Sequence, residues 1–107
     1  MARPNIVLIH IDDMGWKDAS YAGSDLYETP NIDRLAREGV VFTSAYACAG
    51  NCAPSRACLL SGQYTPRHGV YAVGNTKRGP VTLMRLIPVP NRQHLEAGNV
   101  TMAEDIG

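Results

Sequence analysis

The chain has 107 residues, of which 45% are hydrophobic and 19% charged, a balance typical of a folded protein rather than a disordered one. Its ten basic and ten acidic residues cancel, which argues against a nucleic-acid partner or an anionic membrane surface. No run approaches the roughly 20 apolar residues of a membrane-spanning helix. No secretory signal is visible, so we expect a cytoplasmic protein if the start is genuine, and a periplasmic or secreted one if a signal was trimmed.

The first predicted element is a strand at residues 5–11. These residues read NIVLIHI, a nearly continuous apolar run rich in β-branched side chains, which is typical of a strand buried on both faces of a parallel sheet. His10 lies within this run, and we expect it to be a core histidine. The run ends abruptly at Asp12 and Asp13, and a turn-rich stretch follows.

A helix is predicted next, at residues 30–38. Thr29 is a suitable N-cap, Pro30 suits the first helical position, and Gly39 is expected to end the helix in the left-handed conformation. The residues after it, about 40–46, indicate a second strand. A strand, a helix and a strand within about 40 residues predict an α/β fold.

A second helix is predicted at residues 54–62, after a loop of small residues. We expect Leu59 and Leu60 to form its apolar face and Gly62 to end it. Farther along the chain, residues 81–87 have moderate strand character.

The last predicted element begins near residue 101. Thr101 and Glu104 match the Ser/Thr-x-x-Glu capping box, which marks the start of a helix. A helix needs several turns to offset the cost of nucleation. We therefore expect residues 1–107 to be a partial domain, cut near the start of this helix.

Residues 52–62 carry the most specific pattern in the sequence. They read CAPSRACLLSG, which resembles the sulfatase signature Cys-x-Pro-Ser-Arg-x-x-Leu-x-(Ser/Thr)-Gly. In that family a formylglycine-generating enzyme oxidises the leading cysteine to formylglycine, also called 3-oxoalanine. Cys52 is the one cysteine followed by x-Pro-Ser-Arg, so the resemblance assigns the modification to it. Cys58 is expected to be a core residue of the helix, and Cys48 has no assigned role.

Neighbouring segments resemble the same family in order and spacing. Residues 4–15 are similar to its first strand and metal-binding turn, 29–39 to the helix that follows, and 62–69 to the segment after the signature. The resemblance covers roughly residues 4–70, then fades until about residue 100. It implies the N-terminal part of an alkaline-phosphatase-like α/β sandwich with a mostly parallel central sheet.

The implied activity is hydrolysis of a carbohydrate or aryl sulfate ester. A hydrated aldehyde carries two hydroxyls on one carbon, so one can attack sulfur while the other later expels sulfate. Residue 52 is expected just ahead of a helix N-terminus, where free N–H groups favour anions. The positively charged guanidinium group of Arg56 can donate paired hydrogen bonds to an oxyanion, and the resemblance implies that Arg56 is catalytic.

Asp12 and Asp13 are the candidate metal ligands. They follow the first strand at its carboxyl end, where open α/β sheets place their sites, and carboxylates are hard ligands for Ca²⁺ or, alternatively, Mg²⁺. The resemblance implies that both bind Ca²⁺ together with residue 52, so the three should converge. It also implies further ligands and an acid far downstream. We therefore expect the 107 residues alone to be inactive.

Other interpretations stay open. Some phosphonate monoester and phosphodiester hydrolases of the same superfamily share the signature, and the anion site does not separate sulfate from phosphate. A non-catalytic remnant with an unmodified Cys52 and no metal is a further alternative. His68 fits either a substrate contact or a hydrogen-bonding loop residue.

Overall fold

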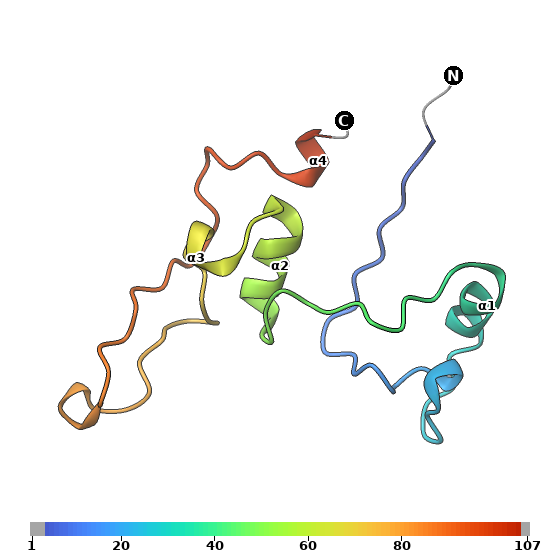
Figure 1. The fold of residues 1–107 in the computed structure, drawn as a ribbon, viewed down its shortest axis with the longest axis horizontal. Coiled ribbons are helices and arrows are strands. Elements are labelled where there is room, and N and C mark those ends of the chain that lie inside the picture. Colours follow the sequence, from blue (N-terminus) through green and yellow to red (C-terminus); the bar gives the residue numbers. More distant parts are fainter. Residues whose placement is uncertain (1–3, 106–107) are drawn as a thin grey trace. The chain divides into compact units, whose positions relative to one another are not determined.

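The computed structural model describes residues 4–105. Its elements, in chain order, are η1 (Ser20–Ala22), α1 (Pro30–Glu38), α2 (Cys52–Ser61), α3 (Thr65–His68), η2 (Val81–Leu83) and α4 (Met102–Asp105) (Figure 1). They fall into two compact units, Met1–Ala45 and Tyr46–Gly107, each of which is described by itself. Within residues 4–105, none of the helices has the length and apolar character that a membrane span requires.

The first unit contains the helix predicted at residues 30–38, with the same bounds. Thr29 is its N-cap, but the threonine side chain does not cap the helix. The Thr29 hydroxyl instead donates to Asp33 Oδ1 at 2.9 Å and accepts from the Ser20 N–H at 2.9 Å, which ties η1 to α1. Gly39 is extended, with φ −118° and ψ −151°, so the left-handed ending was wrong. Glycine adopts both conformations readily, and the sequence does not choose between them.

In the second unit, α2 begins two residues earlier than predicted, at Cys52. Its first intrahelical bond runs from the Ser55 N–H to the Asn51 carbonyl at 3.0 Å. Pro54 lies in the first turn, where its missing N–H has no intrahelical partner to lose. Gly62 ends the helix in the left-handed conformation, with φ 64° and ψ 15°, which confirms the predicted stop.

No strand is present within residues 4–105. Residues 5–11 and 40–46 are irregular and exposed, and His10 is exposed with them rather than in a core. A strand is stable only when a neighbour pairs its N–H and C=O groups and covers its apolar side chains. Within residues 4–105 neither segment is paired with another strand, so the parallel sheet stays a prediction. Strand character at 81–87 was wrong for Val81–Leu83, which forms a 3₁₀ turn.

The core of the second unit lies where α2 meets α3 and the chain that follows. Helices α3 and α4 both pack against α2. The predicted apolar face was wrong, because Leu59 is 38% exposed and Leu60 42%. The buried residues are mostly small, namely Pro54, Ala57, Cys58, His68, Val70 and Ala72.

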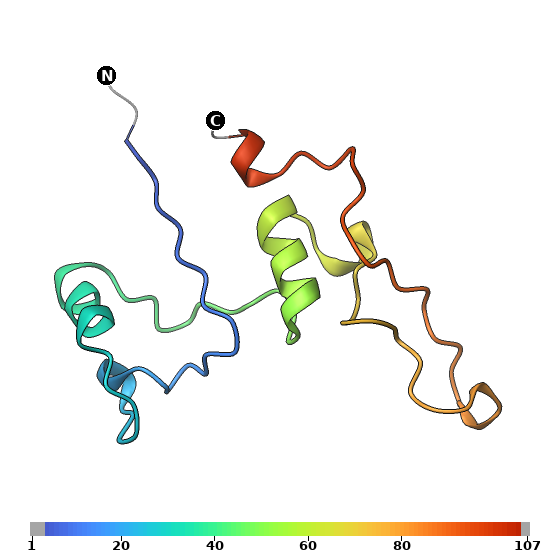
Figure 2. The same ribbon diagram turned by 180° about the vertical axis from the view of Figure 1, so that it is seen from behind.

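Residues 69–76 and 89–93 form the two arms of an excursion beyond α3, and they lie side by side in both views (Figures 1 and 2). The Arg92 N–H donates to the Gly69 carbonyl at 2.9 Å. Asn91 Oδ1 accepts from the Tyr71 and Ala72 N–H groups at 2.6 and 2.9 Å, and its amide donates to the Ala72 carbonyl at 2.9 Å. A side-chain amide thus holds the arms together in place of strand pairing.

The predicted capping box is present in part at the start of α4. Glu104 Oε2 accepts from the Thr101 N–H at 2.7 Å and from the Thr101 hydroxyl at 3.0 Å. These bonds lower the pKa of the Glu104 carboxyl, the backbone bond most. The helix begins at Met102, as the capping box predicts.

Candidate functional site

The N-terminus of α2 carries the first candidate residue. Cys52 is the first helical residue and is half-buried, and no side chain caps the helix at Asn51. The N–H groups of Cys52 and Ala53 precede the first intrahelical donor, Ser55, so they have no partner within the helix. Such N–H groups, together with the helix dipole, favour an anion beside residue 52.

Helix α2 has two different faces, and the signature residues divide between them. Successive helical residues turn by about 100°, so Arg56 lies only about 40° around the helix from Cys52. Cys58 lies about 160° from Arg56, on the opposite side. The opposite side is the buried one, with Pro54, Ala57 and Cys58, whereas Arg56 is exposed. The small residues of the signature therefore pack α2 against the core of its unit, and Cys52 and Arg56 share the other face.

In the first unit, Asp12 and Asp13 line one hollow of about 350 Å³. The hollow is lined by Asp12, Asp13, Met14, Asp18, Tyr27, Glu28 and Thr29. Both aspartates are exposed, and Asp13 has φ 56°, in the left-handed region that aspartate tolerates better than most residues. This backbone turn sets two successive carboxylates at the rim of the same hollow.

The chemistry of this donor set fits a hard cation. Carboxylate oxygens suit Ca²⁺ or Mg²⁺, but a calcium ion takes about 6–8 oxygens. Within residues 4–105, no group of three or more His, Cys, Asp or Glu side chains is close enough to enclose a metal. Asp12 and Asp13 can therefore provide part of a metal site and not all of it.

The predicted convergence of the two aspartates with Cys52 stays a prediction. Asp12 and Asp13 belong to Met1–Ala45, and Cys52 and Arg56 belong to Tyr46–Gly107. Each pair is organised locally, the first by a backbone turn and the second by a helix N-terminus.

All three cysteines are free thiols with different surroundings. Cys48 is exposed, Cys52 half-buried and Cys58 buried, which confirms the core position predicted for Cys58. Since exposure favours reaction of a thiol, Cys58 is the least accessible of the three to a reagent in solution.

His68 is the residue whose role the sequence left most open. Its side chain is 1% exposed, so it contacts the core of its own unit and not solvent. Nδ1 accepts from the Val70 N–H at 3.1 Å, which assigns the proton of a neutral ring to Nε2. Nε2 lies 3.3 Å from Cys58 Sγ and donates to it. The hydrogen-bonding alternative therefore holds for His68, but inside a core and not in an exposed loop.

Burial lowers the pKa of His68 below its usual range. As the pH falls, the unfolded chain, with a histidine pKa of about 6.5, therefore binds a proton at a higher pH than the native protein does. We expect the contribution of this residue to stability to be complete above that value and to fall as the pH drops toward the lower native pKa. Urea unfolding at about pH 7.5 and about pH 5.5 measures the loss.

The variant His68→Gln is the matched control for this prediction, since glutamine does not titrate. The exposed His10 and His94 stay in both proteins and cancel in the comparison. An equal loss of stability in the variant and the unchanged protein would show that His68 does not cause it.

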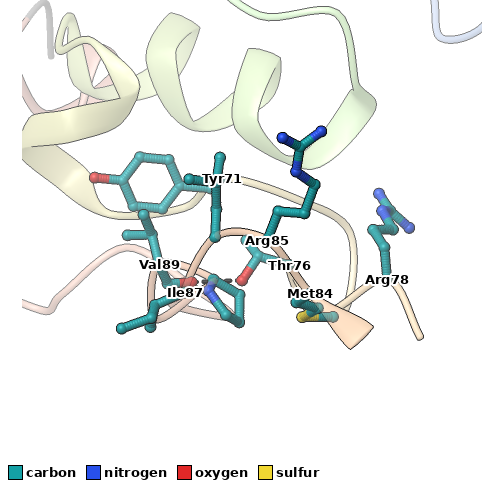
Figure 3. Close-up of a pocket in the computed structure, with 9 residues that line it drawn as sticks. Tyr71, Thr76, Arg78, Met84, Arg85, Ile87 and Val89 are labelled. Atoms are coloured by element: carbon teal, nitrogen blue, oxygen red, sulfur yellow. Dashed lines mark hydrogen bonds between the residues drawn. The ribbon is translucent and has the colours of Figure 1, made fainter. Parts of the chain in front are cut away.

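A second hollow, of about 490 Å³, lies in the excursion beyond α3 (Figure 3). Tyr71, Ile87 and Val89 provide apolar walls, and the guanidinium groups of Arg78 and Arg85 extend away from them. This hollow could not be predicted from the sequence, because its residues match no pattern and come together through the Asn91 contacts. It is open, and Ile87 is 95% exposed.

Comparison with known proteins points to one family. A family model described as Sulfatase matches residues 4–95. The chain is 44% identical over 93 residues to N-acetylgalactosamine-6-sulfatase of Mus musculus, which covers 86% of this chain and 18% of that protein. It is 43% identical over 113 residues to a protein named Sulfatase from Formosa agariphila, covering 97% and 20%. Arylsulfatase H of Canis lupus familiaris is 49% identical over 78 residues, covering 73% and 14%. The chain thus spans at most 20% of these relatives.

Proposed function

Because this chain belongs to the sulfatase family, we propose that it forms the N-terminal part of a sulfuric ester hydrolase whose reactive residue derives from Cys52. The observation that carries the proposal is the construction of α2. Cys52 occupies its uncapped N-terminus, and Arg56 lies one turn later on the same face. The family implies an alkaline-phosphatase-like fold, and the parallel sheet is part of the proposal.

The residues of α2 provide an anion site for a sulfate ester. The Cys52 and Ala53 N–H groups can donate to a sulfate oxygen, and the exposed Arg56 guanidinium can donate two parallel bonds to the same group. Charge that develops on sulfate oxygens is stabilised best by donors fixed before the reaction. A ten-residue helix packed through its opposite face fixes these donors.

Formylglycine at residue 52 would supply a hydrated aldehyde, whose two hydroxyls provide a nucleophile and a built-in route for release. Its formation requires a formylglycine-generating enzyme acting on residues 52–56. Cys52 is half-buried at a helix terminus, whereas Cys58 is buried, which agrees with modification at residue 52 alone.

A divalent cation, Ca²⁺ in preference to Mg²⁺, would be held by Asp12, Asp13 and residue 52, and it would polarise the sulfate group. Two carboxylates at the rim of one hollow fit this role. The remaining ligands would come from outside these 107 residues, as would the acid that protonates the leaving group. We therefore propose that residues 1–107 are a partial catalytic domain that is inactive alone.

The test is hydrolysis of an aryl sulfate by the full-length protein over a range of Ca²⁺ concentrations. We expect turnover to require Ca²⁺, and Asp13→Asn to require a higher concentration for half-maximal activity while the unfolding midpoint changes little. Asparagine tolerates the left-handed conformation of residue 13, so the substitution removes the charge and keeps the turn.

Three outcomes would contradict the proposal. Preference for a phosphonate monoester or a phosphodiester over the aryl sulfate would favour the other hydrolases with this signature. Turnover by residues 1–107 alone would show that the site is complete without further ligands. An unmodified thiol at residue 52 in an inactive protein would favour a non-catalytic remnant.

A further inference from the structure

We infer that His68 is a positioning residue that holds α2, through Cys58, in the rotation that presents Cys52 and Arg56 on its exposed side. The inference rests on the proposed function, since it assigns His68 a part in that reaction. It depends on three observations, namely the burial of His68, the partners of its two ring nitrogens, and the division of α2 into two faces.

The contacts of the imidazole fix its place from both sides. Val70 donates its N–H to Nδ1 at 3.1 Å, and Nε2 donates to Cys58 Sγ at 3.3 Å. The Thr65 hydroxyl lies 3.7 Å from the same sulfur. No buried side-chain nitrogen or oxygen within residues 4–105 lacks a partner, so the ring is fully satisfied as it stands. A neutral, fully paired imidazole links the end of α3 to the middle of α2.

The link matters because little else on the buried face of α2 is directional. Pro54 and Ala57 are buried and apolar, and their side chains make no hydrogen bond. A hydrogen bond to Cys58 Sγ favours one rotation of the helix over its neighbours. Cys58 and Arg56 lie about 160° apart around the same helix. If α2 turns about its axis so that Cys58 shifts, Arg56 turns by the same angle.

A small rotation has a large effect on catalysis. Displacing reactive groups by about 1 Å, through a change far from the chemistry, can cost about 10²-fold in rate. His68 bonds to Cys58 on the buried side of α2, so its substitution should leave the chemical groups of Cys52 and Arg56 unchanged and alter only their position. The expected result is a lower kcat in a protein that still folds and is still modified at Cys52.

Two variants of similar shape separate the link to Cys58 from the local turn. In His68→Asn, the amide oxygen can replace Nδ1 as acceptor for Val70, but nothing reaches Cys58. In His68→Gln, the amide nitrogen can reach Cys58, and Val70 loses its acceptor. If His68 acts through Cys58, we expect kcat of the full-length sulfatase to fall by roughly 10- to 100-fold in His68→Asn. The loss in His68→Gln should be smaller.

The measurement is kcat on an aryl sulfate, divided by the fraction of protein that is folded and carries formylglycine at residue 52. Intact mass gives the modified fraction. Adding Cys58→Ala to His68→Asn should cost little more, because both changes remove the same bond and such pairs are not additive. A purely structural role would lower the unfolding midpoint and leave the normalised kcat unchanged.

Equal normalised kcat in the wild type and His68→Asn would overturn the inference, as would an equal loss in the two His68 variants. Failure of the proposed function is a different result, because the wild-type protein would then not hydrolyse the aryl sulfate at all.

Discussion

Cys52→Ala should abolish aryl sulfate hydrolysis by the full-length protein. Alanine cannot be converted to an aldehyde, so residue 52 would provide neither the nucleophile nor the second hydroxyl that releases sulfate. The side chain is half-buried at the first position of α2, and alanine is a good helix former, so the helix should persist. Steady-state turnover measures the loss, and the far-ultraviolet circular dichroism spectrum checks the fold.

Two matched controls locate this effect at residue 52. Cys58→Ala removes a buried thiol from the same helix and should keep both the modification of Cys52 and measurable turnover, with kcat lowered by roughly 10- to 100-fold because the bond to His68 is lost. Cys52→Ser provides one hydroxyl instead of the two of a hydrated aldehyde. It lacks the group that expels sulfate, so it should not turn over repeatedly. Normal turnover by Cys52→Ala would mean that another residue carries the reaction.

Arg56→Ala should lower kcat/KM by at least about 10²-fold, the cost of removing a preorganised partner of a developing oxyanion. Arg56 lies on the exposed face of α2, about 40° around the helix from Cys52, and is not part of the buried face. Its loss should therefore affect catalysis far more than stability. Steady-state kinetics and an unfolding curve on the same preparation separate the two.

Arg56→Lys is the informative comparison for this prediction. Lysine keeps the positive charge but cannot make two parallel hydrogen bonds to one sulfate group. We expect it to recover only part of the loss. The expected loss of kcat/KM in Arg56→Ala is about 10²-fold. A loss of less than about threefold would show that Arg56 is not part of the catalytic site.

Helices α1, α2 and α4 could be predicted from the sequence because their signals are local, whereas α3 (Thr65–His68) was not predicted. Thr29 and Pro30 set the start of α1, Gly62 the end of α2, and the pair Thr101 and Glu104 the start of α4. The predicted start of α2 is two residues late, because a proline is favoured at the first helical position whereas Pro54 is the third residue of this helix. A proline is tolerated throughout the first turn, so it marks that turn and not one position.

What the sequence could not predict depends on contacts between distant residues. The buried face of α2 is set by His68, Val70 and Ala72, which lie beyond the helix, and so Leu59 and Leu60 were assigned to the wrong face. The Cys58–His68 bond joins residues ten apart with no pattern of their own. A strand at 5–11 would depend on neighbours that pair with it, and no strand lies within residues 4–105.

Residue 52 is proposed above as the modified, reactive residue of a sulfatase. The most direct measurement is the mass of the peptide that contains residue 52, from the full-length protein produced together with a formylglycine-generating enzyme. We expect the mass of the aldehyde at residue 52 and of unmodified thiols at Cys48 and Cys58. An unmodified Cys52 in a protein that hydrolyses the aryl sulfate would contradict this proposal.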